Sequence, residues 1–214
     1  SLQGRLCLTN FLALKIKYGV SMILNDKEIR CGLVEMLLSR KQKPARIIHE
    51  LPIDNGNAIA DVVAVYKQLH CYEIKGDGDK VERLQSQGFF YNQTFPKITL
   101  VTTEKHLIRA LNIAPSFWGI IIAFNHNGRV KMRYIRKATE NINISKNSAL
   151  QTLWKEEMVS LMDYYGLHLK KSEMNRTNIS REISLKINKK ELNEKISSLL
   201  EKRKSSFIKH INQM

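Results

Sequence analysis

The stretch AIADVVAVYKQLHCYEIK, residues 58–75, determines the architecture of this protein. Its two runs, 58–66 and 69–75, are rich in the β-branched and aromatic residues typical of strands, and two polar residues separate them. The first run is apolar except for Asp61, a residue that is costly to bury unless something pairs with it. In the second run Glu73 and Lys75 are two residues apart and project to one side. The spacing suits adjacent strands of a hairpin.

The surrounding sequence predicts an α/β domain over residues 1–166, with a mixed central sheet flanked by helices. Asp26 is expected to cap a helix that ends near residue 39, and Asp79 with Glu82 has capping-box spacing for a helix to about residue 92. The loops 54–57 and 125–128 contain Asn and Gly and indicate hairpins. The further expected strands are 46–53, 97–103, 117–124 and 129–136, and the further expected helices are 2–21, 104–111 and 148–165.

Residues 167–214 have a different composition. They hold twelve Lys and Arg against five Glu, and Asn188 with Glu191 has the spacing of a helix cap. An apolar edge follows at helical spacing, made by Leu192, Ile196, Leu199, Leu200, Phe207, Ile208 and Ile211. We expect a basic helical tail behind a flexible joint at Gly166, able either to contact DNA or to form a homodimer or protein complex through its apolar edge.

The overall charge points to an anionic partner. The 214 residues carry a formal net charge of +15 and the sequence pI is near 9.8, which favours nucleic acid first and an anionic membrane surface second. No run approaches the length of a membrane-spanning helix, and no cleavable leader is recognisable, so we expect a cytoplasmic protein. The three cysteines are far apart, which argues against structural zinc and a disulfide framework.

The carboxylates of the hairpin favour metal chemistry. Two carboxylates offer hard oxygen ligands to Mg²⁺, so Asp61 and Glu73 are candidate ligands. The ammonium of Lys75 could orient the attacking water and offset charge that develops on a phosphate. The simpler interpretation is an ordinary ion pair between Lys75 and a carboxylate on an exposed strand face.

With its flanking helices, this arrangement resembles the PD-(D/E)XK nuclease superfamily. Asp61 would be its first acidic position and Glu73-Ile74-Lys75 its signature. The resemblance implies a restriction-endonuclease-like core, Mg²⁺ or Mn²⁺ as cofactor, and phosphodiester hydrolysis. Over residues 26–119 the chain also resembles a small group of nuclease-like bacterial and mobile-element proteins. The matching positions are Glu50-Leu51, Gly56, Asp61, Tyr72 to Lys75, Asp79, Glu82-Arg83-Leu84, Gln87, Tyr91 and Trp118-Gly119. One departure is Ile59, where that group has a basic residue.

Further site residues are expected near the hairpin. Glu50, which precedes the hairpin turn, is the first candidate for a third acid that binds the metal, with Glu28 and Glu35 on the first helix as rivals. A four-residue repeat places Arg83, Gln87 and Tyr91 on one helix face, where they either help bind the substrate or form a solvated face. His49 and His70 are interpreted as half-buried strand residues.

The sequence alone leaves two candidate functions from different classes. The first is a metal-dependent nuclease that hydrolyses phosphodiester bonds, with DNA as the expected substrate. The alternative is a catalytically inactive nuclease-fold module that binds nucleic acid within a larger mobile-element or defence complex. Membrane association through the basic helix is weaker, because its apolar edge lacks Trp and is interrupted by Lys and Ser.

Overall fold

The computed structural model describes residues 23–203, so the helix expected at 2–21 and the last eleven residues of the tail lie outside the described part. The strands are β1 (Arg46–Ile53), β2 (Ala58–Val65), β3 (Leu69–Lys75), β4 (Lys97–Thr102), β5 (Gly119–His126) and β6 (Arg129–Arg136). The α-helices are α2 (Asp26–Ser39), α3 (Leu84–Thr94), α4 (Leu107–Ile113), α5 (Lys146–Leu150), α6 (Lys155–Tyr164), α7 (Arg176–Lys186) and α8 (Lys189–Lys202). All six strands expected from the sequence are therefore present.

The strands form one mixed sheet in the order β1-β2-β3-β4-β5-β6. Strands β1, β2 and β3 are antiparallel neighbours, β3, β4 and β5 are parallel, and β6 returns antiparallel to β5. The two parallel connections pass through α3 and α4, as parallel pairing requires a crossover. The expectation of an α/β fold with a mixed sheet flanked by helices is confirmed.

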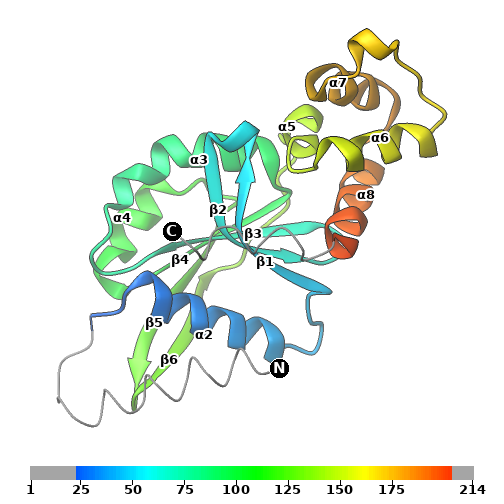
Figure 1. The fold of residues 1–214 in the computed structure, drawn as a ribbon. Helices are drawn as coiled ribbons and strands as arrows, with labels where there is room; N and C mark the ends of the chain where they lie inside the picture. Colours follow the sequence, from blue (N-terminus) through cyan, green and yellow to red (C-terminus); the bar gives the residue numbers. More distant parts are fainter. Residues whose placement is uncertain (1–22, 204–214) are drawn as a thin grey trace, which may run out of the picture.

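Helices cover both faces of the sheet (Figure 1). One face packs against α2, whose buried Ile29, Leu33 and Leu37 contact strand residues that include Val62 and Ile74. The other face packs against α3, α4 and the C-terminal helices in a larger apolar cluster. We call these the α2 side and the α3 side of the sheet.

The C-terminal helices α5 to α8 pack together beside the sheet (Figure 1). Leu192, Ile196 and Leu200 of α8 are at most 1% exposed and belong to the same cluster as the α3 side of the sheet. This corrects two expectations. Residues 167–203 of the tail are part of the packed fold, and Leu192, Ile196 and Leu200 of the expected apolar edge are covered by the chain itself, while Phe207, Ile208 and Ile211 lie outside the described part.

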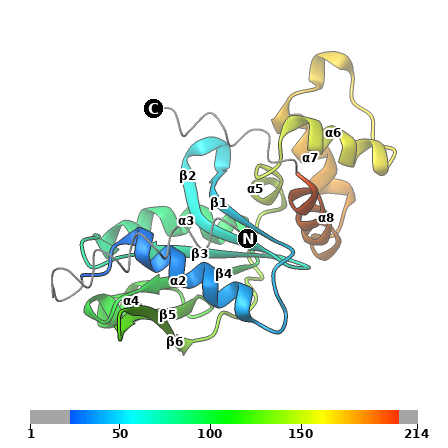
Figure 2. The ribbon, with the colours of Figure 1, turned by 60° about the horizontal axis from the view of Figure 1, so that its bottom comes forward.

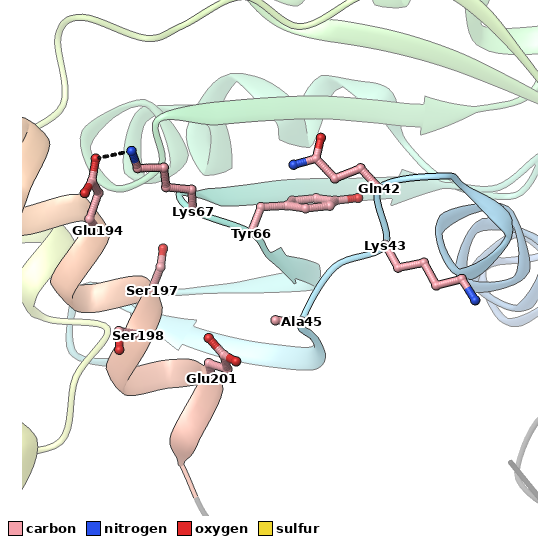
Figure 3. Close-up of a pocket in the computed structure, with 9 residues that line it drawn as sticks. All are labelled: Gln42, Lys43, Ala45, Tyr66, Lys67, Glu194, Ser197, Ser198 and Glu201. Carbon is pink, nitrogen blue, oxygen red and sulfur yellow. Dashed lines mark ion pairs between the residues drawn. The ribbon is translucent and has the colours of Figure 1, made fainter.

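A pocket of about 310 Å³ lies where α8 meets the sheet (Figure 3). The connection between α2 and β1 lines one side, and Tyr66 and Lys67 of the β2–β3 turn line another. Lys67 forms an ion pair of 3.2 Å with Glu194 of α8 across it. Neither Asp61 nor Glu73 lines this pocket, so its role concerns the docking of α8 rather than the expected site.

Three expected helix ends differ from the structure. Asn25, not Asp26, caps α2, with Glu28 completing a capping box. The Asp79 carboxylate accepts a hydrogen bond from Gly76 N at 2.7 Å instead of capping, and α3 begins only at Leu84, after a short 3-10 turn. The helix expected over 148–165 is split between α5 and α6. The Asn188 cap of α8 is confirmed, because its side chain accepts from Glu191 N.

The outer half of the β1–β2 hairpin bends away from the sheet (Figure 2). Ala58 and Ala60 pack on the α3 side, yet farther along the strand Val63 and Val65 occupy that side. Strand residues alternate between faces, so this change of parity means that β2 is distorted between residues 60 and 63. Glu50, on the neighbouring strand, has a φ of 53°, which a residue with a side chain rarely adopts. The bend therefore falls beside Asp61.

His70 is partly buried in β3 between two hydroxyl groups. Its Nε2 lies 2.8 Å from Thr99 Oγ1, and its Nδ1 lies 3.2 Å from the Tyr72 hydroxyl. Burial, followed by the positive charges of Lys97 and Arg40, lowers the pKa of His70 to about 3. The imidazole is therefore neutral in the folded protein at neutral pH.

We expect His70 to make the fold sensitive to acid. The unfolded chain protonates His70 below a pKa of about 6.5 and the folded chain does not, so this residue lowers stability as the pH falls from 6.5 towards 3. Glu73 acts in the opposite direction, because its pKa is raised on folding. To separate the two effects, the stability of wild type is compared with that of a variant that lacks the His70 imidazole. The stability of wild type relative to His70→Gln should fall by about 1–2 kcal/mol between pH 7.5 and pH 5 in urea unfolding. The same comparison with His126→Gln, at an exposed histidine, is the matched control.

Candidate active site

Asp61 and Glu73 meet where β2 and β3 separate. The pairing of these strands ends at Val62 and Tyr72, so Asp61 and Glu73 are the next residues beyond the last pair. From here β2 bends with the hairpin, while β3 continues beside β4 to Lys75. We call this place the fork. The fork opens space between two strands that would otherwise hydrogen-bond to each other.

Asp61 is anchored on two sides of the fork. Its Oδ2 accepts from Ile74 N at 2.8 Å, and its Oδ1 lies 3.4 Å from Nη2 of Arg30 on α2. Arg30 also donates to the Asp61 carbonyl at 2.6 Å and pairs with Asp26 at 3.2 Å. Burial raises the pKa of Asp61, while the Ile74 hydrogen bond and the charges of Lys75 and Arg30 oppose this rise.

Glu73 is almost completely buried, at 1% exposure, on the α3 side of the sheet. Its Oε1 lies 2.5 Å from the Lys75 ammonium, and its Oε2 accepts from the Tyr91 hydroxyl of α3 at 2.7 Å. That hydroxyl is also 2.9 Å from the carbonyl of Ile59 on the bent hairpin. Burial, followed by the charge of Asp61, raises the pKa of Glu73 to about 7, against the opposing effects of Lys75 and Tyr91. Glu73 thus pairs with Lys75, while the neighbouring Asp61 carboxylate is held by Ile74 N and Arg30 and affects Glu73 through its charge.

Tyr91→Phe should lower the free energy of unfolding by about 1–3 kcal/mol, because it leaves a buried carboxylate oxygen without its donor. Urea unfolding followed by circular dichroism measures this loss. Tyr164→Phe is the matched control, since it removes the hydroxyl of a tyrosine that is 67% exposed and should change stability by less than about 0.5 kcal/mol. Equal losses in both variants would contradict the role given to the Tyr91 hydroxyl.

The expected third acid does not join the fork. Glu50 is exposed, and it lies at the bend with a positive φ that a regular strand residue does not have. Of its rivals, Glu28 caps α2 and Glu35 is exposed. Within residues 23–203 no three His, Cys, Asp or Glu side chains are grouped so that they could hold a metal ion. The carboxylates of Asp61 and Glu73 therefore make up the donor set that the fork offers.

The three residues expected on one helix face have different surroundings. Arg83 lies before α3 and is exposed, and Gln87 is partly buried with a covered Oε1 that has no hydrogen-bond partner among the described residues. Tyr91 is fully buried. Its hydroxyl contacts Glu73, so it does not form a solvated face with Arg83.

Arg30 and Asp26 are the members of the site that sequence reasoning missed. They are four residues apart on α2, the spacing of a helical ion pair, and this was the available signal. The contact of Arg30 with Asp61 spans 31 residues of sequence and depends on how α2 crosses the sheet. Local spacing could not supply it.

The fold and the fork define an α/β protein with paired carboxylates at the separation of two strands. The family model described as bacteriophage P4 protein cII matches residues 21–214, so this chain belongs to the bacteriophage P4 protein cII family. Protein cII of Enterobacteria phage P4 is 27% identical over 146 residues, which are 68% of this chain and 55% of that protein. The chain thus spans about half the length of this curated relative.

Among solved structures, a protein of unknown function from Silicibacter pomeroyi is similar with a TM-score of 0.42 and 12% sequence identity. The alignment covers 67% of this chain and 94% of that one. The resemblance to the PD-(D/E)XK superfamily stays a prediction. Within residues 23–203, no helix combines the length and apolarity that crossing a bilayer requires.

Proposed function

We propose that this protein is a metal-dependent nuclease with a restriction-endonuclease-like core that hydrolyses phosphodiester bonds of DNA in the cytoplasm. The observation that supports the proposal is the convergence of Asp61, Glu73 and Lys75 at the fork. A buried Glu73–Lys75 pair beside the partly buried Asp61 is costly, and such groups are more common at functional sites than elsewhere.

The fork fits a hard divalent cation in part. Asp61 and Glu73 would hold Mg²⁺ or Mn²⁺, since each carboxylate has more lone pairs than its present hydrogen bonds use. Glu50 stays a prediction as a third ligand. When bound, the ion supplies Lewis-acid stabilisation of the charge that develops on the phosphate.

The chain's own groups have separate tasks in this proposal. The Lys75 ammonium, 2.5 Å from Glu73, offsets negative charge on the phosphate and orients the attacking water. Tyr91 holds the second oxygen of Glu73, and Arg30 fixes the backbone at Asp61. Arg83 and Gln87 remain proposed contacts for the substrate strand.

Incubation of the pure protein with end-labelled single-stranded DNA, duplex DNA and RNA tests the proposal. Cleavage is expected with Mg²⁺ or Mn²⁺ and none with EDTA, and a DNA substrate should be preferred. Activity that persists in EDTA, or no cleavage of any substrate with either ion, would contradict it. Glu156→Gln, which changes an exposed carboxylate on α6, should cleave as wild type does.

One observation favours the alternative of an inactive module that binds nucleic acid. Both oxygens of Glu73 are already engaged, by Lys75 and by Tyr91, and no third acid joins the group within residues 23–203. A divalent cation that binds the folded protein must raise its melting temperature with concentration. An active nuclease should show this dependence on Mg²⁺ or Mn²⁺, whereas an inactive module should not.

A further inference from the structure

The outermost strand, β6, carries a row of cations. Arg129, Lys131 and Arg133 alternate along the strand and are all exposed. The residues between them, Val130 and Met132, pack on the α2 side of the sheet. Alternation therefore directs the three cations, which we call the β6 row, to the α3 side.

The β6 row and the fork share a face and an edge of the sheet. Glu73 and Lys75 alternate with Ile74, which packs on the α2 side, so they project to the α3 side as the row does. The parallel strands β3, β4 and β5 end at one edge, and Arg129 follows directly after the turn that leaves β5. Three strand spacings of about 4.8 Å, or roughly 15 Å, separate Lys75 from Arg133, which is level with it in the register, and Lys131 and Arg129 lie farther along β6.

The short 3-10 turn η3 (Glu104–His106), which follows β4, lies between the end of β3 and the β6 row. Lys105 Nζ donates to the carbonyl of Asp77, just beyond β3, at 2.6 Å. Glu104 pairs with Arg133 of the β6 row at 2.9 Å. Exposed Lys105 thus stands between the fork and the row.

The most basic segment of the sequence uses its cations differently. In the C-terminal helices, several Lys and Arg side chains donate to backbone carbonyls and hold the helices together. These are Lys146 to Ile187, Arg176 to Gln151 and Leu153, Lys189 to Ile142, and Arg203 to Thr152. In contrast, Arg129 and Lys131 have no ion pair or side-chain hydrogen bond with any residue in 23–203. Their charge is available to a ligand.

We propose that the β6 row, with Lys105, contacts the phosphate backbone of the nucleic acid whose cleavage is proposed at the fork. This inference rests on the proposed function for the identity of the polyanion. Alternate residues of a strand are about 6–7 Å apart, a spacing comparable with that of successive phosphates in an extended strand. Phosphate contacts of this kind give affinity with little sequence preference and strong salt dependence.

A charged edge strand also has a simpler use, because Lys and Arg protect an exposed edge from pairing with another sheet. The two roles have different consequences. Loss of edge protection would cause self-association and leave nucleic-acid affinity unchanged. Loss of phosphate contacts would weaken binding while the protein stays monodisperse.

The test measures fluorescence anisotropy of labelled single-stranded and duplex DNA in EDTA, so that no cleavage occurs, between about 50 and 200 mM salt. The variant is Arg129→Gln/Lys131→Gln. The matched control is Arg181→Gln/Lys190→Gln, which removes the same charges from exposed positions on α7 and α8. Light scattering checks for self-association.

The β6 variant should bind single-stranded DNA at least about 10-fold more weakly at 0.1 M salt and lose roughly 1.4 from the slope of log affinity against log salt. The control should change affinity less than twofold. Equal weakening by the control, or unchanged affinity in the β6 variant, would overturn the inference. These outcomes are independent of catalysis. If the β6 variant weakens binding as expected but the protein cleaves nothing, this inference stands and the proposed nuclease activity is wrong. If the protein cleaves DNA and the β6 variant binds with unaltered affinity, the proposed nuclease activity stands and this inference is wrong.

Discussion

Replacement of Asp61 by Asn should reduce metal-dependent cleavage by at least about 100-fold, because one ligand charge is worth several kcal/mol of transition-state stabilisation at a metal centre. The amide keeps the size of the carboxylate and can still accept the hydrogen bond from Ile74 N through its oxygen. The fold should therefore persist, and the loss should be one of chemistry. Single-turnover cleavage rates at saturating protein measure it without interference from weakened binding.

Two further measurements make this result specific. The melting temperature of Asp61→Asn without metal should stay close to that of wild type, while its increase with Mg²⁺ or Mn²⁺ should disappear. Asp163→Asn is the matched control, since it makes the same change at an exposed acid of α6 and should cleave as wild type does. If Asp61→Asn cleaves as fast as wild type, the activity belongs to another site or to another protein.

The fork could be predicted from residues 58–75 because its geometry is local. Two strand-forming runs with a two-residue connection pair in one register, and that register brings Asp61 beside Glu73. The alternation of Glu73, Ile74 and Lys75 then fixes which side chains share a face. The structure has this register and pairs Glu73 with Lys75, whereas Arg30 of α2, from outside the hairpin, contacts the Asp61 carboxylate.

The environment of the fork could not be predicted in this way. Tyr91 was expected to face the substrate because a four-residue repeat gives a shared helix face, but a repeat does not say whether that face is inside or outside. The buried partner of Tyr91 is 18 residues away, and Arg30 is 31 residues from Asp61. Such contacts depend on how helices cross the sheet.

Composition gave the least information on how the cations of the C-terminal region are used. An excess of Lys and Arg predicted an arm for DNA, yet Arg176 and Arg203 donate to carbonyls of the segment between α5 and α6. Helix ends leave carbonyls unsatisfied, and a long cationic side chain can bind them as well as a phosphate can. A count of charges does not distinguish these uses, because it contains no information on the partners.

Gly119 at the start of β5 is where a single added side chain should damage the fold most. A Cβ here would lie 2.5 Å from Thr99 Oγ1 and 2.9 Å from Ala138 N, distances that side chains do not tolerate. Thr99 is 1% exposed and has little room to move. We expect Gly119→Val to lower the free energy of unfolding by about 3 kcal/mol, near the upper end of the cost of overpacking a core. This close approach also explains why a glycine follows Trp118 at this position of the chain.

Gly78→Val provides the matched control, because a Cβ at Gly78 meets nothing within 4 Å and its φ is not in the left-handed region. That variant should stay within about 0.5 kcal/mol of wild type in urea unfolding. A second readout separates the local collision from general loosening. Thr99 Oγ1 is also a partner of His70, at 2.8 Å, so a displaced Thr99 should expose the imidazole and raise the pKa of His70 from about 3 towards its ordinary value. If NMR titration finds the His70 pKa unchanged in a destabilised Gly119→Val, the collision is relieved at Ala138 and Thr99 stays in place.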